Sequence, residues 1–219
     1  FFVKDIILFG NGDLAEVIAY YLESDSEYRV KAFTIDGKYI KEDSFLKRDI
    51  IAFEDVEKFY QPDKYKMFVA LGYAKMNKIR EKKVDEAKAK GFQLISYIHP
   101  KSNICPELNI GENSFIFENN VIQPFVKIGA NNILWSGNHI GHHSVIGDNN
   151  FIASHVVISG RVNIENNCFI GVNATIRDNV TIASETLIGA SALVMSSTKE
   201  QEVYRSLKTK PARIKSHQL

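Results

Sequence analysis

Aliphatic residues occupy every sixth position of this chain from Ile98 to Val194, without interruption. Fifteen of these seventeen residues are isoleucine. A period of six fits neither an amphipathic helix nor a single amphipathic strand. It is typical of a parallel β-helix, in which one short strand and one turn recur every six residues and three such hexads form a triangular coil. The β-branched side chains are expected to point into the prism and to stack along its axis.

Residues 1–97 follow a different pattern, in which short apolar runs alternate with amphipathic stretches. The order β-α-β-(α)-β-α-β favours a small open parallel sheet with helices on both faces. The sequence therefore predicts an α/β, Rossmann-like half domain over residues 1–97, an all-β parallel β-helix over residues 98–194 and a tail over residues 195–219. The strands of the first domain are predicted at 5–9, 29–35, 67–71 and 92–98, and its helices at 16–22 and about 75–90.

The tail has lost the period of six and carries six Lys or Arg residues against two Glu. We expect it to cap the end of the β-helix, whose strand edges would otherwise be exposed. A second interpretation is that some of its cations also bind a phosphate-bearing ligand. These cations are Lys199, Arg205, Lys208, Lys210, Arg213 and Lys215.

Composition and charge narrow the classes of partner. The chain has 219 residues and a net charge of +1, which favours neither nucleic acid nor an anionic membrane as a partner. No apolar run approaches the roughly 18 residues of a membrane span, and no signal-peptide pattern opens the sequence. Cys105 and Cys168 are expected to be free thiols, so we expect a cytoplasmic protein.

The segment from Gly10 to Ala15, Gly-Asn-Gly-Asp-Leu-Ala, lies between a predicted strand and a predicted helix. This is the context of a dinucleotide-binding loop, and Asp36 ends the second strand where a ribose-binding acid is expected. A dinucleotide fold needs two β-α-β-α-β halves, and this domain has room for about one. The loop therefore predicts a site for a single nucleotide, with phosphates near the helix N-terminus. The alternative is a tight strand–helix turn without a ligand.

Four of the six histidines fall within seventeen residues, namely His139, His142, His143 and His155. Turns of the repeat normally take Asn, Asp, Gly or Ser, so this run has no evident structural use. His142 and His143 are the third and fourth residues of the hexad that Ile140 opens, which predicts that they lie at or beside a turn. A neutral imidazole is a suitable general base near pH 7, whereas several converging imidazoles could hold Zn²⁺.

The period-six helix, the histidine pair within it and the small N-terminal domain together resemble a bacterial family. This family comprises the hexapeptide-repeat sugar acyltransferases of the sialic acid O-acetyltransferase type, including N-acetyltransferases of nucleotide-linked 4-amino-4,6-dideoxy sugars. The resemblance covers nearly the whole chain. It implies a left-handed β-helix, a homotrimer with active sites between subunits, acetyl-CoA as co-substrate, no metal, and a role in O-antigen or surface-polysaccharide biosynthesis.

The resemblance also assigns the catalytic residues. In the family motif, a catalytic histidine precedes an acidic residue and then a Val-Ile-Gly hexad start. Here the stretch from Gly141 to Gly147 reads Gly-His-His-Ser-Val-Ile-Gly, so His142 is the implied base. His143 stands where the acid is expected, which leaves open whether another group, such as Asp148, orients the imidazole.

Two binding sites follow from the same matching. The implied acyl-CoA groove is lined by Phe151, Gly160, Val172, Gly189 and Ala190, with the Gly160 N–H nearest the thioester oxygen. The implied nucleotide-sugar site comprises Gly10, Asn11, Gly12, Asp13, Asp36, Gly72, Tyr73 and His139.

The activity implied is direct acetyl transfer from acetyl-CoA to the amino group of a nucleotide-linked amino sugar, with a histidine general base and no acyl-enzyme. O-acetylation of a sugar hydroxyl by the same fold is the nearest alternative. A γ-type zinc carbonic anhydrase would need three converging histidines. A non-catalytic β-helix scaffold would leave the histidines unexplained.

Overall fold

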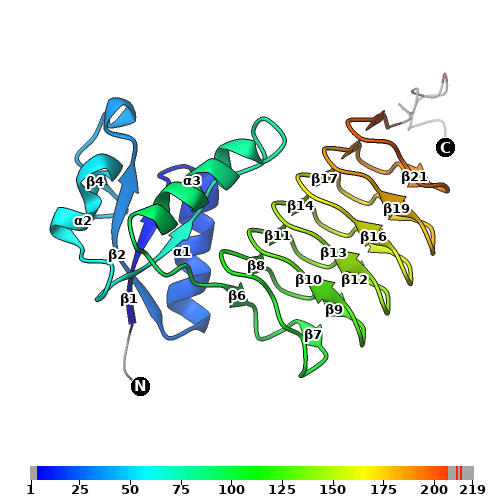
Figure 1. Ribbon diagram of the computed structural model, residues 1–219, viewed down its shortest axis with the longest axis horizontal. Coiled ribbons are helices and arrows are strands. Elements are labelled where there is room, and N and C mark those ends of the chain that lie inside the picture. The colour runs from blue at the N-terminus through cyan, green and yellow to red at the C-terminus, as the bar shows by residue number, and fades with distance from the viewer. Residues whose placement is uncertain (1–3, 207–210, 212, 214–219) are drawn as a thin grey trace.

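The computed structural model describes residues 4–206, Pro211 and Arg213 (Figure 1). The tail residues Lys208, Lys210 and Lys215 lie outside the described residues. Along the chain, a small α/β domain is followed by a three-sided β-helix whose coils stack away from it (Figure 1). No helix in the described part of the chain is long and apolar enough to span a membrane.

The N-terminal domain contains a five-stranded sheet in the order β3-β4-β2-β1-β5. All its pairs are parallel except that of the short edge strand β3 with β4. Its elements, with two 3-10 turns marked η, are β1 (Lys4–Phe9), α1 (Asp13–Asp25), β2 (Tyr28–Ile35), η1 (Gly37–Tyr39), β3 (Ser44–Phe45), β4 (Arg48–Ala52), η2 (Phe53–Asp55), α2 (Val56–Phe59), β5 (Lys66–Val69) and α3 (Lys78–Ala89).

The two faces of this sheet are covered by different helices. Side chains alternate along a strand, so Ile6 and Leu8 of β1 pack with α1, whereas Ile7 and Phe9 pack with α3. Coverage of both faces is the usual condition for a parallel sheet. The predicted open sheet with helices on both faces is thus present.

Three local predictions differ from the structure. β4 was not predicted, because its sequence begins with charged residues and resembles a loop. The predicted strand at 92–98 is divided: Leu94 makes a single bridge to Met67, and the last two residues join the β-helix. Helix α3 begins at Lys78 rather than near Lys75, because the three residues before it have a positive φ and cannot continue a helix.

The β-helix consists of two-residue strands in three parallel sheets. Paired residues lie 18 positions apart, from Tyr97↔Phe115 to Ile176↔Val194, so three hexads form one coil. The seven-stranded sheet contains β6 (Tyr97–Ile98), β8 (Phe115–Ile116), β11 (Ile133–Leu134), β14 (Phe151–Ile152), β17 (Phe169–Ile170), β20 (Leu187–Ile188) and β22 (Val203–Tyr204). The six-stranded sheet contains β7 (Asn103–Ile104), β9 (Val121–Ile122), β12 (His139–Ile140), β15 (Val157–Ile158), β18 (Thr175–Ile176) and β21 (Leu193–Val194). The four-stranded sheet contains β10 (Lys127–Ile128), β13 (Val145–Ile146), β16 (Asn163–Ile164) and β19 (Thr181–Ile182).

The aliphatic residues of period six form the core of the prism. Ile140, Ile158 and Ile176 are completely buried and stack in successive coils of one sheet. Each fully buried isoleucine stabilises the fold by about 1.5–3 kcal/mol. The predicted fold class, a Rossmann-like half domain plus a left-handed parallel β-helix, is confirmed.

Each hexad from Ile110 to Ile188 turns at its fourth residue, which has a positive φ. The turns stack in three rows, one along each corner of the prism, and two of the rows are named after their characteristic residues. The histidine corner joins the six-stranded to the four-stranded sheet, and its fourth residues are Phe125, His143, Arg161 and Asn179. The asparagine corner joins the four-stranded to the seven-stranded sheet, with Asn113, Asn131, Asn149, Asn167 and Glu185. The third corner completes the coil with Asn119, Gly137, His155, Asn173 and Ser191.

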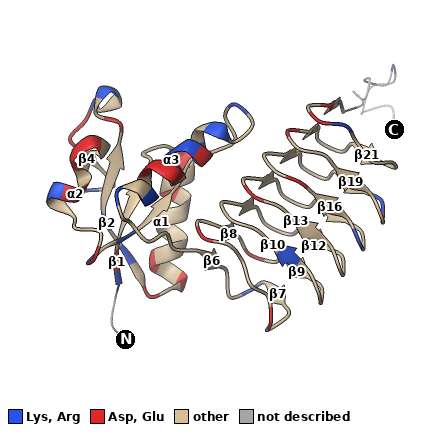
Figure 2. Cartoon of the chain, in the orientation of Figure 1, with Lys and Arg blue, Asp and Glu red and all other residues tan. Residues whose placement is uncertain are grey.

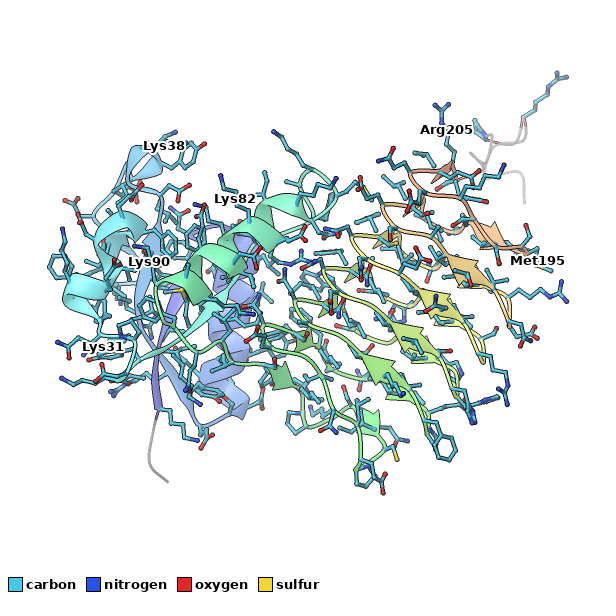
Figure 3. The ribbon with its side chains drawn as sticks, in the orientation of Figure 1. Lys31, Lys38, Lys82, Lys90, Met195 and Arg205 are labelled. Carbon is cyan, nitrogen blue, oxygen red and sulfur yellow. The ribbon has the colours of Figure 1, made fainter. Side chains whose placement is uncertain are left out.

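The far end of the β-helix is closed by a shortened coil. β22 pairs with β20 at a spacing of 16 residues, Leu187↔Val203, and Tyr204 packs against the core of the prism. Met195 and Arg205 mark this end in Figure 3, remote from the N-terminal domain. The domain boundaries at 97/98 and 194/195 stay predictions.

The N-terminal domain packs against the seven-stranded sheet and the asparagine corner. Phe115, Ile133 and Phe151 on the outer face of that sheet belong to the same hydrophobic cluster as α1. Asn113 pairs with the backbone of Val69, whose N–H donates to Asn113 Oδ1 at 2.7 Å. Charged residues gather along α3 and the outer elements of this domain, whereas most of the coil ribbon is uncharged (Figure 2).

Arg80 of α3 is completely buried at this interface. Its five N–H groups donate to six acceptors, one N–H at Nη1 being shared, and all six acceptors are neutral: Asn131 Oδ1, Asn77 Oδ1 and the carbonyl oxygens of Leu71, Gly72, Asn131 and Asn150. Burial lowers the pKa of Arg80 to about 9, so the side chain is still a cation at neutral pH. One side chain thus connects α3, the loop after β5 and two coils of the β-helix.

Arg80→Lys is expected to lower the free energy of unfolding by about 3 kcal/mol or more, because an ammonium cannot reproduce the planar set of donors and leaves buried acceptors without partners. Urea denaturation measures the change. The control is Lys78→Ala, which removes the partly exposed ion pair with Glu185 across the same interface and should cost less than about 1 kcal/mol. Equal effects of the two substitutions would show that Arg80 has no special role.

Candidate active site

His142 and His143 form a hydrogen-bonded pair on the histidine corner. Their Nδ1 atoms are 3.0 Å apart, and the two rings are nearly perpendicular. The backbone N–H of His142 donates to Gln123 Oε1 at 2.9 Å, and that of His143 donates to the Pro124 carbonyl at 3.3 Å. The turn of the preceding coil therefore supports both histidines.

The Nδ1–Nδ1 contact leaves the Nε2 atom of each ring outside the pair, and the tautomer sets which Nε2 carries a free lone pair. A hydrogen bond between two imidazole nitrogens needs one proton, supplied by one ring. When Nδ1 of neutral His143 accepts, His142 carries its proton on Nδ1, and its Nε2 has a free lone pair. Desolvation, the nearby charge of Arg161 and the neighbouring His142 all lower the pKa of His143, which favours the neutral form of this imidazole at neutral pH. His143 thus occupies the place of the expected acid and can orient His142 itself.

Gly160 lies directly against the ring of His142. A Cβ atom at position 160 would be 2.8 Å from both Cε1 and Nε2 of His142, so any side chain there would displace the ring. The next residue, Arg161, donates its backbone N–H to the His142 carbonyl at 2.9 Å. The Gly160 N–H has no acceptor within the described part of the chain.

Two further residues of this corner, Phe125 and Arg161, are not among those predicted from the sequence. The Phe125 ring packs on His143 with centroids 4.7 Å apart, and Arg161 contributes to the lowered pKa of His143. Both occupy the fourth position of a hexad, where Asn is the commonest residue in this chain. A bulky side chain at that position is the signal that could have identified them.

The other histidines of the run lie elsewhere. His139 is half-buried in β12, on the outer face of the six-stranded sheet. His155 lies on the third corner, where its ring fills the space beside Gly137. Asp148 lies on the asparagine corner and accepts the Ala130 N–H at 2.7 Å, so it does not orient His142. Within residues 4–206, no group of three or more His, Cys, Asp or Glu side chains could hold a metal ion.

Most of the predicted nucleotide-sugar residues line one cavity of ≈ 440 Å³ in the N-terminal domain. These are Gly10, Asn11, Gly12, Asp13, Asp36 and Gly72. Glycine is required at position 10, where φ is +126° and a Cβ would lie 2.8 Å from the Ala70 carbonyl oxygen. Helix α1 begins at Asp13, so its N-terminus opens into this cavity, an arrangement that favours a phosphate.

Asp36 is not free in this cavity. Its Oδ1 lies 2.5 Å from Lys83 Nζ, which also contacts Glu86 at 2.6 Å. Burial lowers the pKa of Lys83, but its hydrogen bonds to these two carboxylates outweigh burial, and the net pKa is raised. Asp36 and Lys83 thus offer a ribose or a phosphate a paired anion and cation.

Tyr73 does not line the cavity. Its ring packs on Phe151 and Phe169 of the seven-stranded sheet, at centroid distances of 5.0 and 4.5 Å. Phe151 is therefore almost covered by the N-terminal domain. Tyr73 and Phe151 meet each other at the domain interface, although the sequence analysis assigned them to different ligands.

Apart from Phe151, the predicted acyl-CoA residues are distributed over two corners of the prism. Gly160 is beside His142, whereas Val172, Gly189 and Ala190 lie on the third corner, in later coils. The histidine corner is also opposite the seven-stranded sheet, against which the nucleotide cavity's domain packs. A single chain therefore does not bring its cavity and its histidine pair together.

Comparisons with known proteins agree with this division into two domains. Residues 93–204 match the family model described as the GMPPB C-terminal domain, and residues 5–87 match the PglD N-terminal domain. No curated protein matches the sequence.

Several solved structures share the fold over almost the whole chain. The acetyltransferase domain of PglB from Neisseria gonorrhoeae is 22% identical, with 95% of this chain and 100% of that chain covered and a TM-score of 0.82. PerB from Caulobacter crescentus, in complex with CoA and GDP-perosamine, is also 22% identical, with 93% and 95% covered and a TM-score of 0.83. WeeI from Acinetobacter baumannii is 21% identical, with 91% and 96% covered and a TM-score of 0.77.

Arg161→Gln is expected to raise the pKa of His143 towards its ordinary value, because a nearby cation disfavours the imidazolium and its removal relieves that effect. An NMR titration of the histidine Cε1–H signals measures the shift. Arg29→Gln, in the N-terminal domain, serves as the control and should leave the titration unchanged. If His143 titrates identically in all three proteins, Arg161 does not influence the pair.

Proposed function

The chain belongs, through residues 93–204, to the GMPPB C-terminal domain family, and from this premise we propose that it is an acetyl-CoA-dependent N-acetyltransferase of a nucleotide-linked amino sugar. More finely, we assign it to the sialic acid O-acetyltransferase type of hexapeptide-repeat enzymes. The observation that carries the proposal is the His142–His143 pair, which leaves an imidazole nitrogen free to act as a base. The nucleotide-sized cavity in the N-terminal domain and the CoA and GDP-perosamine bound to PerB support it.

The proposed reaction is a direct transfer. The amine nitrogen of the sugar attacks the thioester carbonyl carbon, and Nε2 of His142 takes the proton that the nitrogen must lose. The carbonyl oxygen becomes an oxyanion, which the Gly160 N–H can stabilise. The C–S bond then breaks, and His142 returns the proton to the leaving thiolate. The acetamido sugar, still linked to its nucleotide, and free CoA are the products.

Neither cysteine is suited to forming an acyl-enzyme. Cys168 is buried in the prism, and burial raises the pKa of its thiol to about 11. The thiol of Cys105 donates to Glu107, and this hydrogen bond raises its pKa. Since the thiolate is the nucleophilic form, both are poor nucleophiles. Two free thiols also fit a reducing compartment, and we propose that the enzyme works in the cytoplasm, in surface-polysaccharide biosynthesis.

A second copy is needed to complete the proposed site. The nucleotide cavity and the histidine pair lie on different sides of the prism in one chain, so we propose that a homotrimer brings the cavity of one copy to the histidine corner of its neighbour. Exposed apolar side chains on the six- and four-stranded sheets support an interface there. These are Val121, Val145, Val157 and Leu193. Val172, Gly189 and Ala190 would then line the acetyl-CoA groove together with the neighbour's Gly160.

His142→Ala is expected to lower kcat by about 10²–10⁴-fold, because the general base is lost, while the Kd for acetyl-CoA stays unchanged. The assay is thiol release from acetyl-CoA with a panel of nucleotide-linked amino sugars and the corresponding hydroxy sugars. His155→Ala, on the third corner, is the matched control and should retain full turnover. Near-normal turnover of the His142 variant would refute the assignment, and thiol release with only the hydroxy sugars would favour O-acetylation.

The pH dependence tests His143. In the unaltered protein, the lowered pKa of His143 favours its neutral form, and activity is expected to be lost as pH falls and the pair takes up a proton. His143→Glu is expected to move the acid limb of kcat/KM to higher pH, because a carboxylate stabilises the imidazolium of His142. His143→Asn, an uncharged acceptor, should leave the limb near its original position. An acid limb that does not move in the Glu variant would show that position 143 does not contact the base.

A further inference from the structure

The histidine corner departs from the turn chemistry of the rest of the β-helix. Asn, which tolerates a left-handed backbone, occupies seven of the fourteen fourth positions from Asn113 to Ser191. On the histidine corner, three successive coils instead place Phe125, His143 and Arg161 there, with φ of 67°, 60° and 58°. Strained backbone of this kind concentrates at functional sites. His143 has a role in the proposed base, but Phe125 has none.

Folding does not account for Phe125. A bulky residue with a left-handed backbone is an outlier, and burial could compensate for its cost. However, the Phe125 side chain is 71% exposed. The ring contacts His143 and otherwise forms the wall of a cavity of ≈ 350 Å³.

This cavity is next to the proposed base. Leu108 and Val126 join Phe125 as its apolar wall, and Gln123 and Glu107 contribute polar groups. Gln123 is the residue that accepts the backbone N–H of His142. The volume lies at the lower end of the range for small-molecule sites, about 300–1,000 Å³, which suits a single sugar ring rather than a whole nucleotide sugar.

The order of groups along the β-helix indicates which substrate this cavity serves. Going up the histidine corner, the cavity comes first, His142 follows one coil later, and Gly160 lies one coil beyond. The proposed acetyl-CoA residues are at Gly160 and in later coils. Direct transfer requires both substrates at His142 together, so the acceptor has to approach from the side of Phe125.

We propose that this cavity is the subsite for the sugar ring of the acceptor, and that Phe125 is a specificity-determining residue whose ring packs on the apolar C–H face of that sugar. Burial of this face supplies affinity, while Gln123 and Glu107 are placed to bond its hydroxyl or amino groups. The inference rests on the proposed function, because acetyl transfer assigns the other side of His142 to the acyl donor.

The test separates backbone strain from binding. Phe125→Asn installs the residue that the turn prefers, so its Tm is expected to equal or exceed that of the unaltered protein. Its KM for the nucleotide-linked amino sugar is expected to rise about tenfold, with KM for acetyl-CoA unchanged. Phe125→Tyr should keep the native KM. His155→Asn gives the same relief of strain on the third corner and should leave both KM values unchanged.

A binding measurement makes the test independent of turnover. The probes are methyl glycosides of 4-amino-4,6-dideoxyhexoses, which lack the nucleotide and therefore report on this cavity alone. Saturation-transfer NMR should detect their binding to the unaltered protein, with an affinity about tenfold lower in Phe125→Asn. Equal affinities, or a rise in KM for acetyl-CoA only, would overturn the subsite. Weaker probe binding in Phe125→Asn, together with no thiol release by the unaltered protein with any sugar, would uphold the subsite and refute the proposed transfer.

Discussion

The β-helix depends on one backbone constraint: each hexad has to turn at a residue with a left-handed conformation. Because this turn recurs at the fourth position of each hexad from Ile110 to Ile188, every coil before the last takes 18 residues, and the aliphatic side chains stack in register. A scaffold so regular leaves no loop within the coils to carry catalytic groups. The candidate site is therefore formed by residues at the turns, where His143, Phe125 and Arg161 replace the more common asparagine.

The second organising contact is the buried guanidinium of Arg80, which joins the N-terminal domain to the asparagine corner of the β-helix. Its acceptors include the carbonyl of Gly72, at the rim of the nucleotide cavity, and groups of two successive coils. Asn113, Asn131 and Asn149 form a ladder of side-chain hydrogen bonds beside it. Each of them also adopts the left-handed backbone conformation of its turn. These contacts fix the position of the nucleotide cavity along the axis of the β-helix. The proposed trimer requires such a fixed position, because the cavity of one copy has to meet the histidine corner of its neighbour.

Sequence patterns were sufficient for the architecture, because the period of six reports directly on the coil. The same period placed His142 at a turn, and the resemblance to a known family implied its proposed role as the base. Three features depended on the structure. The 3.0 Å contact between the Nδ1 atoms of His142 and His143, on which the proposed orienting role depends, is not revealed by any spacing. Arg80 looks like any exposed cation of a charged helix, since burial depends on what packs on it. β4 resembles a loop because its apolar residues follow charged ones.

The shortened last coil has a consequence for assembly. A stack of parallel strands ends in unpaired backbone groups, and two such ends with the same 18-residue outline could dock and extend into a fibre. Here the final pairing, Leu187↔Val203, uses only 16 residues, and Tyr204 closes over the core. The last triangle therefore differs in outline from the coils below it. Because the outlines differ, a second copy cannot continue the 18-residue register at this coil, which disfavours end-to-end stacking.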